Sequence, residues 1–443
     1  MKSEIDMTEG HLWSNILFYS IPLMFAQLLE VMFNMSDVAV VGKFSSYTAL
    51  GSVGSTTLLV SLFTGLLIGL GAGINVRIAY CIGSRNKTET YQTIHSSYLI
   101  CIIAGVIITI LCIILARPML VLIHTKDDLL PGAVLYFRIY ALGMPAMAIY
   151  NCGNGILSAC GDTKKPLIYL SFAGVLNVLL NLIFVIVFKM AAEGVALASI
   201  IAQYLSALLV TLNLVRRDDD CHLDIKKLKL YKNASRAVLI FGIPSGIQNA
   251  IFAVANLFVQ TGVNSFDTIM VSGNSAAANS DSIIYNVMAA FHTACASFIG
   301  QNHGAGKKKR VLKSYLISLS YSFISGSILG ILLIIFGRQF LSLFASNTDV
   351  INAGMERIRI MGISYGVSAF MDCTIAASRG IGKTVIPTIT VIIGSCVFRV
   401  LWIYTIFAYF HTITSLYLLY MFSWGITAIV EIAYFTYCYR KMN

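Results

Sequence analysis

Twelve long apolar stretches constrain what this chain can fold into more than any other feature. Each is about 20 residues or longer, the length that an α-helix needs to cross a bilayer. Only 12% of the residues are charged, against about 25% in soluble domains. The chain is therefore predicted to be an all-α integral membrane protein with short loops. The stretches lie near 12–41, 47–74, 91–116, 130–159, 165–188, 192–215, 237–263, 270–300, 312–336, 348–378, 385–409 and 411–438.

The net charge of +11 follows the loops. If both termini are cytoplasmic, the cytoplasmic loops and termini carry 21 of the 31 Lys and Arg, and the other side carries 5. This asymmetry fits the positive-inside rule. It predicts a multi-pass protein of the cell membrane with both termini in the cytoplasm. The basic charge then has membrane lipid as its partner, and a nucleic-acid partner is not expected.

An internal repeat organises the chain. SIP at 20–22 recurs as GIP at 242–244, and GDTKKP at 161–166 recurs as GKTVIP at 382–387. A repeat of this length in an apolar chain predicts two six-helix lobes, 1–215 and 237–443, joined by a cytoplasmic linker, 216–236. Because six is even, both lobes insert in the same direction. A pseudo-two-fold axis along the membrane normal should relate them, with the substrate site between them.

The first apolar stretch carries Gln27, Glu30, Asn34 and Asp37 at spacings that place them on one helical face. A charge at membrane depth costs about 2.5 kcal/mol or more, so such a side chain usually faces a cavity or a partner. We interpret this face as handling ions or protons. The alternative is a structural hydrogen bond at the outer end of the helix.

The other patterns that suggest chemistry are weak. The ten cysteines are scattered, without CxxC or a Cys/His cluster, and are interpreted as small buried residues rather than disulfides or metal ligands. GKT at 382–384 lacks the first glycine of a phosphate loop, since Ala377 stands there. No cluster of His, Asp or Cys suggests an enzyme. No cofactor is expected beyond a coupling ion.

A glycine ridge in the second stretch, Gly65, Gly69 and Gly73, permits close helix contact. Either simple tight packing or a sliding surface explains it.

Several segments together resemble the multidrug and toxic compound extrusion (MATE) family over essentially the whole chain. They are NMSDVAVVGKF, GILSACGDTKKP, GIPSGIQN, ASFIGQNHGAGKKKR and ASRGIGKTVIP. The resemblance implies twelve helices in two lobes around a central cleft. It also implies efflux of organic, often cationic, compounds in exchange for H⁺ or Na⁺. The acidic residue of the family's first helix maps to Asp37.

One branch of the family has further acids that this chain matches only in part. Its glutamate in the seventh helix corresponds to Phe252, and Asp372 lies about one turn after the aspartate of its tenth helix. Arg399, in the middle of a span, needs neutralising, and we expect a structural ion pair with Asp372 or Asp281. A substrate or ion role for Asp372 stays open.

Two groups of site residues follow. The predicted coupling site consists of Asp37, Glu30, Asn34, Asn177 and Asn181. The predicted substrate cleft consists of Gln27, Asn151, Asn249, Asn256, Gln260 and Asp372. The expected function is a monomeric secondary antiporter for small drug-like compounds. The alternative is a flippase of the same wider superfamily that moves a lipid-linked precursor.

Overall fold

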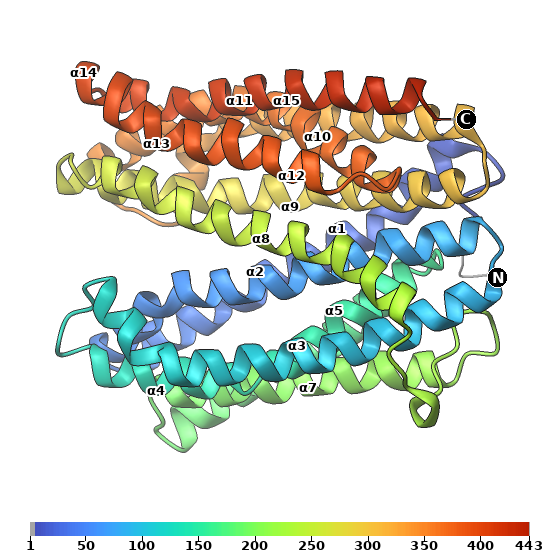
Figure 1. Cartoon of the computed structure of the whole chain (residues 1–443). Helices are drawn as coiled ribbons and strands as arrows, with labels where there is room; N and C mark the ends of the chain where they lie inside the picture. Colours follow the sequence, from blue (N-terminus) through green and yellow to red (C-terminus); the bar gives the residue numbers. More distant parts are fainter. Residues whose placement is uncertain (1–4, 443) are drawn as a thin grey trace. The chain divides into compact units, whose positions relative to one another are not determined.

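The computed structural model describes residues 5–442, and this part of the chain is helical, without a strand (Figure 1). It contains 11 helices long and apolar enough to cross a membrane, and a bent pair makes up to 12. The predicted membrane fold is thus confirmed. The α-helices before the linker are α1 (Leu12–Phe44), α2 (Tyr47–Gly83), α3 (Lys87–Leu122), α4 (Leu130–Ala141), α5 (Met144–Ala159), α6 (Lys164–Leu182) and α7 (Ala192–Val215). After it come α8 (Lys232–Val263), α9 (Thr268–Gly304), α10 (Lys308–Ser342), α11 (Thr348–Gly380), α12 (Val385–Val391), α13 (Phe398–Trp402), α14 (Ala408–Phe410) and α15 (Ile413–Arg440).

Three of the spans are irregular. The stretch predicted at 130–159 is broken into α4 and α5, which are bent by 44°. Pro145 in the first turn of α5 explains the break, since proline disfavours helical geometry in the residue before it. The π-helical segment η1 (Ile183–Val187) continues α6. Two more, η3 (Ile392–Val397) and η4 (Ile403–Phe407), flank α13 within the span Val385–Phe410.

Polar residues at the loop ends start the helices. Ser46 accepts a hydrogen bond from the backbone N–H of Ala49 at the start of α2, and Asp267 accepts one from Met270 at the start of α9. Such N-caps satisfy amide groups that the helix itself leaves unpaired.

The repeat is visible in the backbone. Gly161, after α5, has φ +86°, and Gly382, after α11, has φ +84°. The two glycines stand 221 residues apart, at the start of the GDTKKP and GKTVIP segments. Left-handed geometry favours glycine, which explains why both copies keep it.

Packing divides the described residues into two compact units. The first unit is Phe25–Ala250 with Ile5, and the second is Asp6–Met24 with residues 251–442. The helices α1 and α8 each contribute to both units. The units are defined by packing, whereas the lobes predicted at 1–215 and 237–443 are defined by the repeat.

Helix packing inside each unit is close. In the first, α2 packs against α3, α4 and α5, and α6 against α7. A Cβ atom on Gly69 would lie 2.3 Å from the backbone nitrogen of Gly246, so α2 and the first half of α8 meet backbone to backbone. This observation favours tight packing for the glycine ridge. In the second unit, α11 packs against α9, α10 and α15 (Figure 1).

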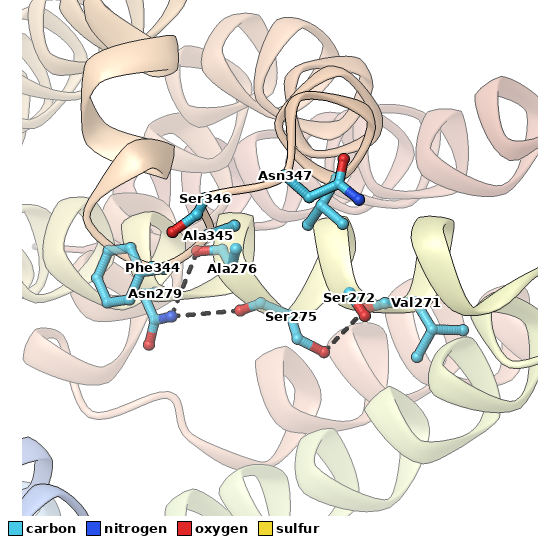
Figure 2. Close-up of a pocket in the computed structure, with 10 residues that line it drawn as sticks. Val271, Ser272, Ser275, Ala276, Asn279, Phe344, Ala345, Ser346 and Asn347 are labelled. Carbon is cyan, nitrogen blue, oxygen red and sulfur yellow. Dashed lines mark hydrogen bonds between the residues drawn. The ribbon is translucent and has the colours of Figure 1, made fainter.

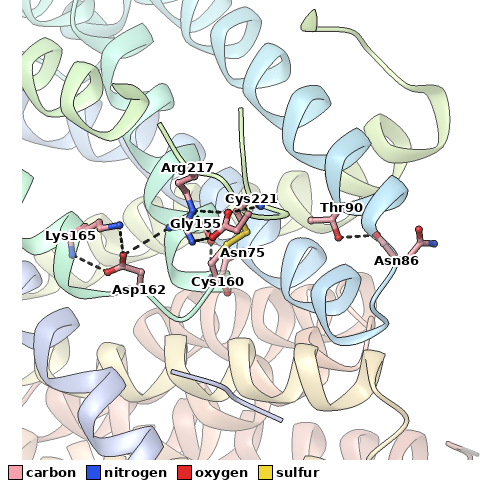
Figure 3. Close-up of a disulfide and its surroundings, with 10 residues drawn as sticks. Asn75, Asn86, Thr90, Gly155, Cys160, Asp162, Lys165, Arg217 and Cys221 are labelled. Atoms are coloured by element: carbon pink, nitrogen blue, oxygen red, sulfur yellow. Dashed lines mark hydrogen bonds and ion pairs between the residues drawn. A yellow bond between two sulfur atoms is a disulfide. The ribbon is translucent and has the colours of Figure 1, made fainter. Parts of the chain in front are cut away.

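The interpretation of all cysteines as free is wrong for two of them. Cys160, which caps α5, and Cys221, in the linker, form a disulfide (Figure 3). The linker folds back on α7 to reach this position, with the backbone N–H of Leu223 donating to the carbonyl of Leu214 at 3.1 Å. A pairing across 61 residues depends on this fold-back, which spacing alone does not reveal.

The linker also contains a charged pair. Arg217, whose side chain is buried, forms an ion pair with Asp219. Burial alone would raise the pKa of Asp219, but the hydrogen bonds from Arg217 lower it below its ordinary value. This acid therefore has a fixed cation as its partner.

Candidate functional site

Asp37, on α1, lies in a cluster of polar side chains within the first unit. Its carboxylate accepts a hydrogen bond from Asn181 Nδ2 at 2.5 Å and one from Ser199 Oγ at 3.0 Å. Asn177 Nδ2 donates to Ser199 Oγ at 3.3 Å, and Asn181 Nδ2 also lies 3.3 Å from Asn177 Oδ1. Three helices, α1, α6 and α7, thus supply one connected group.

No fixed cation neutralises this carboxylate. Among residues 5–442, no Lys, Arg or His forms a salt bridge with Asp37. Asn181 is fully buried, and its Oδ1 atom has no hydrogen-bond partner. A buried carbonyl oxygen without a partner is costly, and so is a buried carboxylate without a counter-ion. The cluster therefore presents oxygen atoms to a small cation or a proton.

The other two members of the predicted coupling site lie apart from this hydrogen-bond network. The side chains of Glu30 and Asn34 are exposed and make no hydrogen bond with any described residue. Glu30 remains electrostatically connected, because Tyr140 interacts with both Asp37 and Glu30. The structure therefore separates one buried acid with donors from one exposed acid without them.

Sequence reasoning missed Ser199 and the tyrosine pair Tyr136 and Tyr140. Ser199 lies in an apolar run of α7, and no sequence pattern distinguishes its hydroxyl from the other serines in membrane spans. The two tyrosines stack with ring centroids 6.0 Å apart, and both interact electrostatically with Asp37.

Four of the predicted cleft residues are distributed over both units. In the first, Asn151 Nδ2 donates to the carbonyl of Met147 at 2.9 Å, and Asn249 Nδ2 donates to that of Gly65 at 3.2 Å. The Oε1 atom of Gln27 is buried without a partner. In the second, Gln260 Nε2 donates to Asn264 Oδ1 at 2.8 Å.

Arg399, on α13, is 2% exposed and lies in a cage of the second unit. Its Nη1 donates to Asn256 Oδ1 at 2.8 Å. Three aromatic rings surround the guanidinium, with centroids 4.7 to 5.9 Å away: Phe252, Tyr420 and Trp424.

The ion pair expected for Arg399 is not formed as predicted. Asp281 pairs with Arg357 instead, and it also accepts a hydrogen bond from Tyr365. Arg357, on α11, approaches α9 at the level of Asp281 and takes the only partner that α9 offers there among the described residues. Asp372 acts on Arg399 and Arg379 through longer-range electrostatic attraction, without a salt bridge to Arg399.

A separate cavity of about 500 Å³ lies at the start of α9, where the α10–α11 connection passes over it (Figure 2). Hydroxyl and amide side chains line it, among them Ser275, Asn279 and Asn347. The amide of Asn279 donates to the carbonyls of Ser275 and Ala276, in its own helix. None of the predicted site residues lines this cavity.

Metal-site geometry was tested on residues 5–442. Within that range, no group of three or more His, Cys, Asp or Glu side chains is placed to hold a metal ion.

The fold and the buried carboxylate together define a polytopic membrane protein built from a repeated helical unit. The model of the MatE family matches the chain twice, over residues 22–183 and 244–405. The chain belongs to this family of multidrug efflux MATE transporters. The second match begins 222 residues after the first, at residue 244 instead of residue 22, which is the offset of the repeat.

Named relatives agree with this assignment. The chain is 27% identical over 367 residues to the probable multidrug resistance protein YpnP of Bacillus subtilis, covering 81% of this chain and 80% of the relative. It is 23% identical over 392 residues to the probable multidrug resistance protein NorM of Thermotoga maritima, covering 85% and 81%. A solved structure of a multidrug resistance MATE family transporter, in an outward-facing conformation, shares the fold. Its TM-score is 0.92 at 21% identity, covering 100% of this chain and 99% of that one.

Proposed function

We propose that this transporter is a secondary antiporter that exports small organic, often cationic, compounds in exchange for H⁺ or Na⁺, and that Asp37 binds the coupling ion. The observation that carries the proposal is the buried Asp37 carboxylate, which has hydrogen-bond donors but no fixed cation. The names of the relatives, both multidrug resistance proteins, support the substrate class.

The first step of the cycle is ion binding at Asp37. A proton on the carboxylate, or Na⁺ between the carboxylate and the free Oδ1 of Asn181, satisfies both groups at once. A hard cation prefers oxygen ligands of this kind. The bound ion also removes the repulsion between lone pairs, which stabilises the packing of α1 on α6 and α7.

The second step is the exchange of ion for substrate. A ligand shifts a conformational equilibrium only as far as its affinities for the two states differ. Ion binding at Asp37 favours the packed state of this cluster, and release of the ion lets α1 take the arrangement that binds the exported compound. Glu30, exposed on the same helix, supplies a negative charge to a cationic substrate.

The experiment is efflux of a fluorescent cationic dye from proteoliposomes, driven by a pH gradient or, separately, by a Na⁺ gradient. Wild type should transport under one gradient or both, and the effective gradient identifies the ion. Asp37→Asn keeps the size of the side chain and removes its charge, so coupled transport should fall to the level of empty vesicles.

Asp372→Asn is the matched comparison, because it removes the other partly buried acid that was predicted to be functional. Transport that survives in Asp37→Asn and disappears in Asp372→Asn would move the coupling site to the second unit. If wild type moves no dye under either gradient, the antiporter proposal fails, and lipid flipping becomes the function to assay.

A further inference from the structure

The Arg399 guanidinium is a buried cation without a counter-ion in contact. Asn256 Oδ1 is the one hydrogen-bond acceptor it reaches among the described residues, and its Nε atom is buried without any acceptor. An arginine at membrane depth is costly unless an anion or several acceptors surround it. Arginine cannot relieve this cost by losing its proton. The site therefore lacks an acceptor.

The family repeat shows that this is not an incidental position. A shift of 222 residues, the distance between the two family matches, places Arg399 on Asn177 and Val259 on Asp37. The same shift places Asn256 on Asn34 and Phe252 on Glu30. The second copy thus loses both acids of the first and gains an arginine, so equivalent positions have the opposite charge.

The cage leaves one side of Arg399 open to a ligand. Tyr420, behind it, is 8% exposed, whereas Asn256 is exposed on α8 and Phe252 is half-buried. The Asn256 carbonyl oxygen, a neutral acceptor, stands where a stronger, charged acceptor would bind. The π-helical segments η3 and η4, on both sides of the turn that carries Arg399, give this span an irregular backbone of the kind often found at functional sites.

We propose that Arg399, reached through Asn256, is a substrate-binding residue that recognises an anionic group, a carboxylate or a phosphate, of the exported compound. This inference rests on the proposed transport function and narrows its substrate class to compounds that carry an anionic group, including zwitterions. A planar guanidinium binds such groups through paired, charge-assisted hydrogen bonds. The aromatic rings supply contact area for the apolar part of the compound.

The test uses two dyes that differ in one charge. Rhodamine B has a free carboxylate and is a zwitterion, and its ethyl ester is a pure cation. Binding of each to the purified full chain is measured in detergent by fluorescence anisotropy, without any ion gradient. Wild type should bind the zwitterion about tenfold more tightly than the ester, as expected for one added charge-assisted pair.

Asn256→Asp is the decisive variant. It changes an exposed side chain, so folding should be preserved, and it places a carboxylate of the protein itself on Arg399. The preference for rhodamine B should then disappear. Gln260→Glu is the matched control, because it adds the same charge to the same helix beside Asn264 rather than Arg399. It should keep the preference.

Arg399→Gln and Arg399→Lys complete the set. The first should lose the preference and the second should keep part of it, since lysine retains the charge without the planar pair of donors. If Arg399→Gln fails to fold, Asn256→Asp still decides the question.

Three results would overturn the inference. One is equal binding of the two dyes by wild type, and another is an unchanged preference in Asn256→Asp, which would make Arg399 structural only. The third is displacement of no dye by free carboxylate but protection by phosphatidylglycerol micelles, which would assign the anion to a lipid headgroup. Because binding is measured at equilibrium, none of these outcomes depends on whether Asp37 couples transport to an ion.

Discussion

The cluster around Asp37 and the cage around Arg399 are built at equivalent positions of the repeat with opposite charge. In the first unit, Asp37 and Asn181 present a carboxylate and a free oxygen without a cation. In the second, Arg399 has the charge but no anion in contact, and Val259 replaces the acid. Each arrangement lacks what would satisfy it. The difference teaches that one scaffold can hold an exchangeable cation in one copy and an anionic group in the other.

The largest expected effect comes from making the first unit resemble the second. Asn177→Lys places a fixed cation beside Asp37, as the repeat does with Arg399. Gradient-driven dye transport should fall to background, because the carboxylate then has a permanent partner. Addition of Na⁺ or acid should also no longer raise the unfolding temperature. A variant that keeps its response to Na⁺ or acid would contradict this comparison.

A packing variant separates general damage from loss of the ion site. Gly69→Ala puts a Cβ atom 2.3 Å from the Gly246 backbone nitrogen, so the helices must move apart. Overpacking of this kind costs about 1–3 kcal/mol. The unfolding temperature should fall while its response to ions persists. Gly54→Ala is the control, since a Cβ there has nothing within 4 Å, and its unfolding temperature should equal that of wild type.

A smaller effect is expected from one hydroxyl. Ser199→Ala removes the 3.0 Å hydrogen bond to Asp37 Oδ2. A hydrogen bond to a charged group contributes about 1.5–3 kcal/mol, so the ion concentration for half-maximal transport should change by about tenfold or more. Ser206→Ala removes a hydroxyl on the same helix that bonds only to the Gln203 carbonyl, and should leave this concentration unchanged. Equal values for wild type and Ser199→Ala would remove Ser199 from the site.

The smallest effect lies outside the membrane, at the acid with a fixed partner. Because the folded pKa of Asp219 is below its ordinary value of 3.8, the Arg217 pair stabilises the protein at pH values above 3.8. That contribution is lost as the pH falls through the folded value. The difference in unfolding temperature between wild type and Asp219→Asn should thus shrink on acidification. For a partly exposed pair it should stay below about 1 kcal/mol. A difference that grows with acid would be the opposite sign.

Sequence reasoning reached the fold and the centre of the first site. Apolar stretches and charge asymmetry are properties of single segments, so they predict spans without knowledge of packing. Asp37, Asn177 and Asn181 were grouped because a polar residue inside a span needs a partner, and the structure brings their side chains into hydrogen-bond contact.

The rest depended on packing that spacing cannot give. Asp281 and Asp372 were equally good partners for Arg399 on paper, and the approach of Arg357 to α9 decided the matter for Asp281. Ser199 carries no signal beyond a hydroxyl in an apolar run. Cys160 and Cys221 meet because the linker folds back, a tertiary event.

The most direct test of the opposite-charge comparison is the unfolding temperature of the purified protein with and without Na⁺, and at neutral and acidic pH, for wild type, Asp37→Asn and Arg399→Gln. A ligand that binds only the folded state stabilises it by about 2.7 kcal/mol at 100 times its dissociation constant. We predict an ion-dependent rise for wild type and Arg399→Gln, and none for Asp37→Asn. A rise that persists in Asp37→Asn, or one that disappears in Arg399→Gln, would contradict the assignment of the exchangeable ion to the first unit.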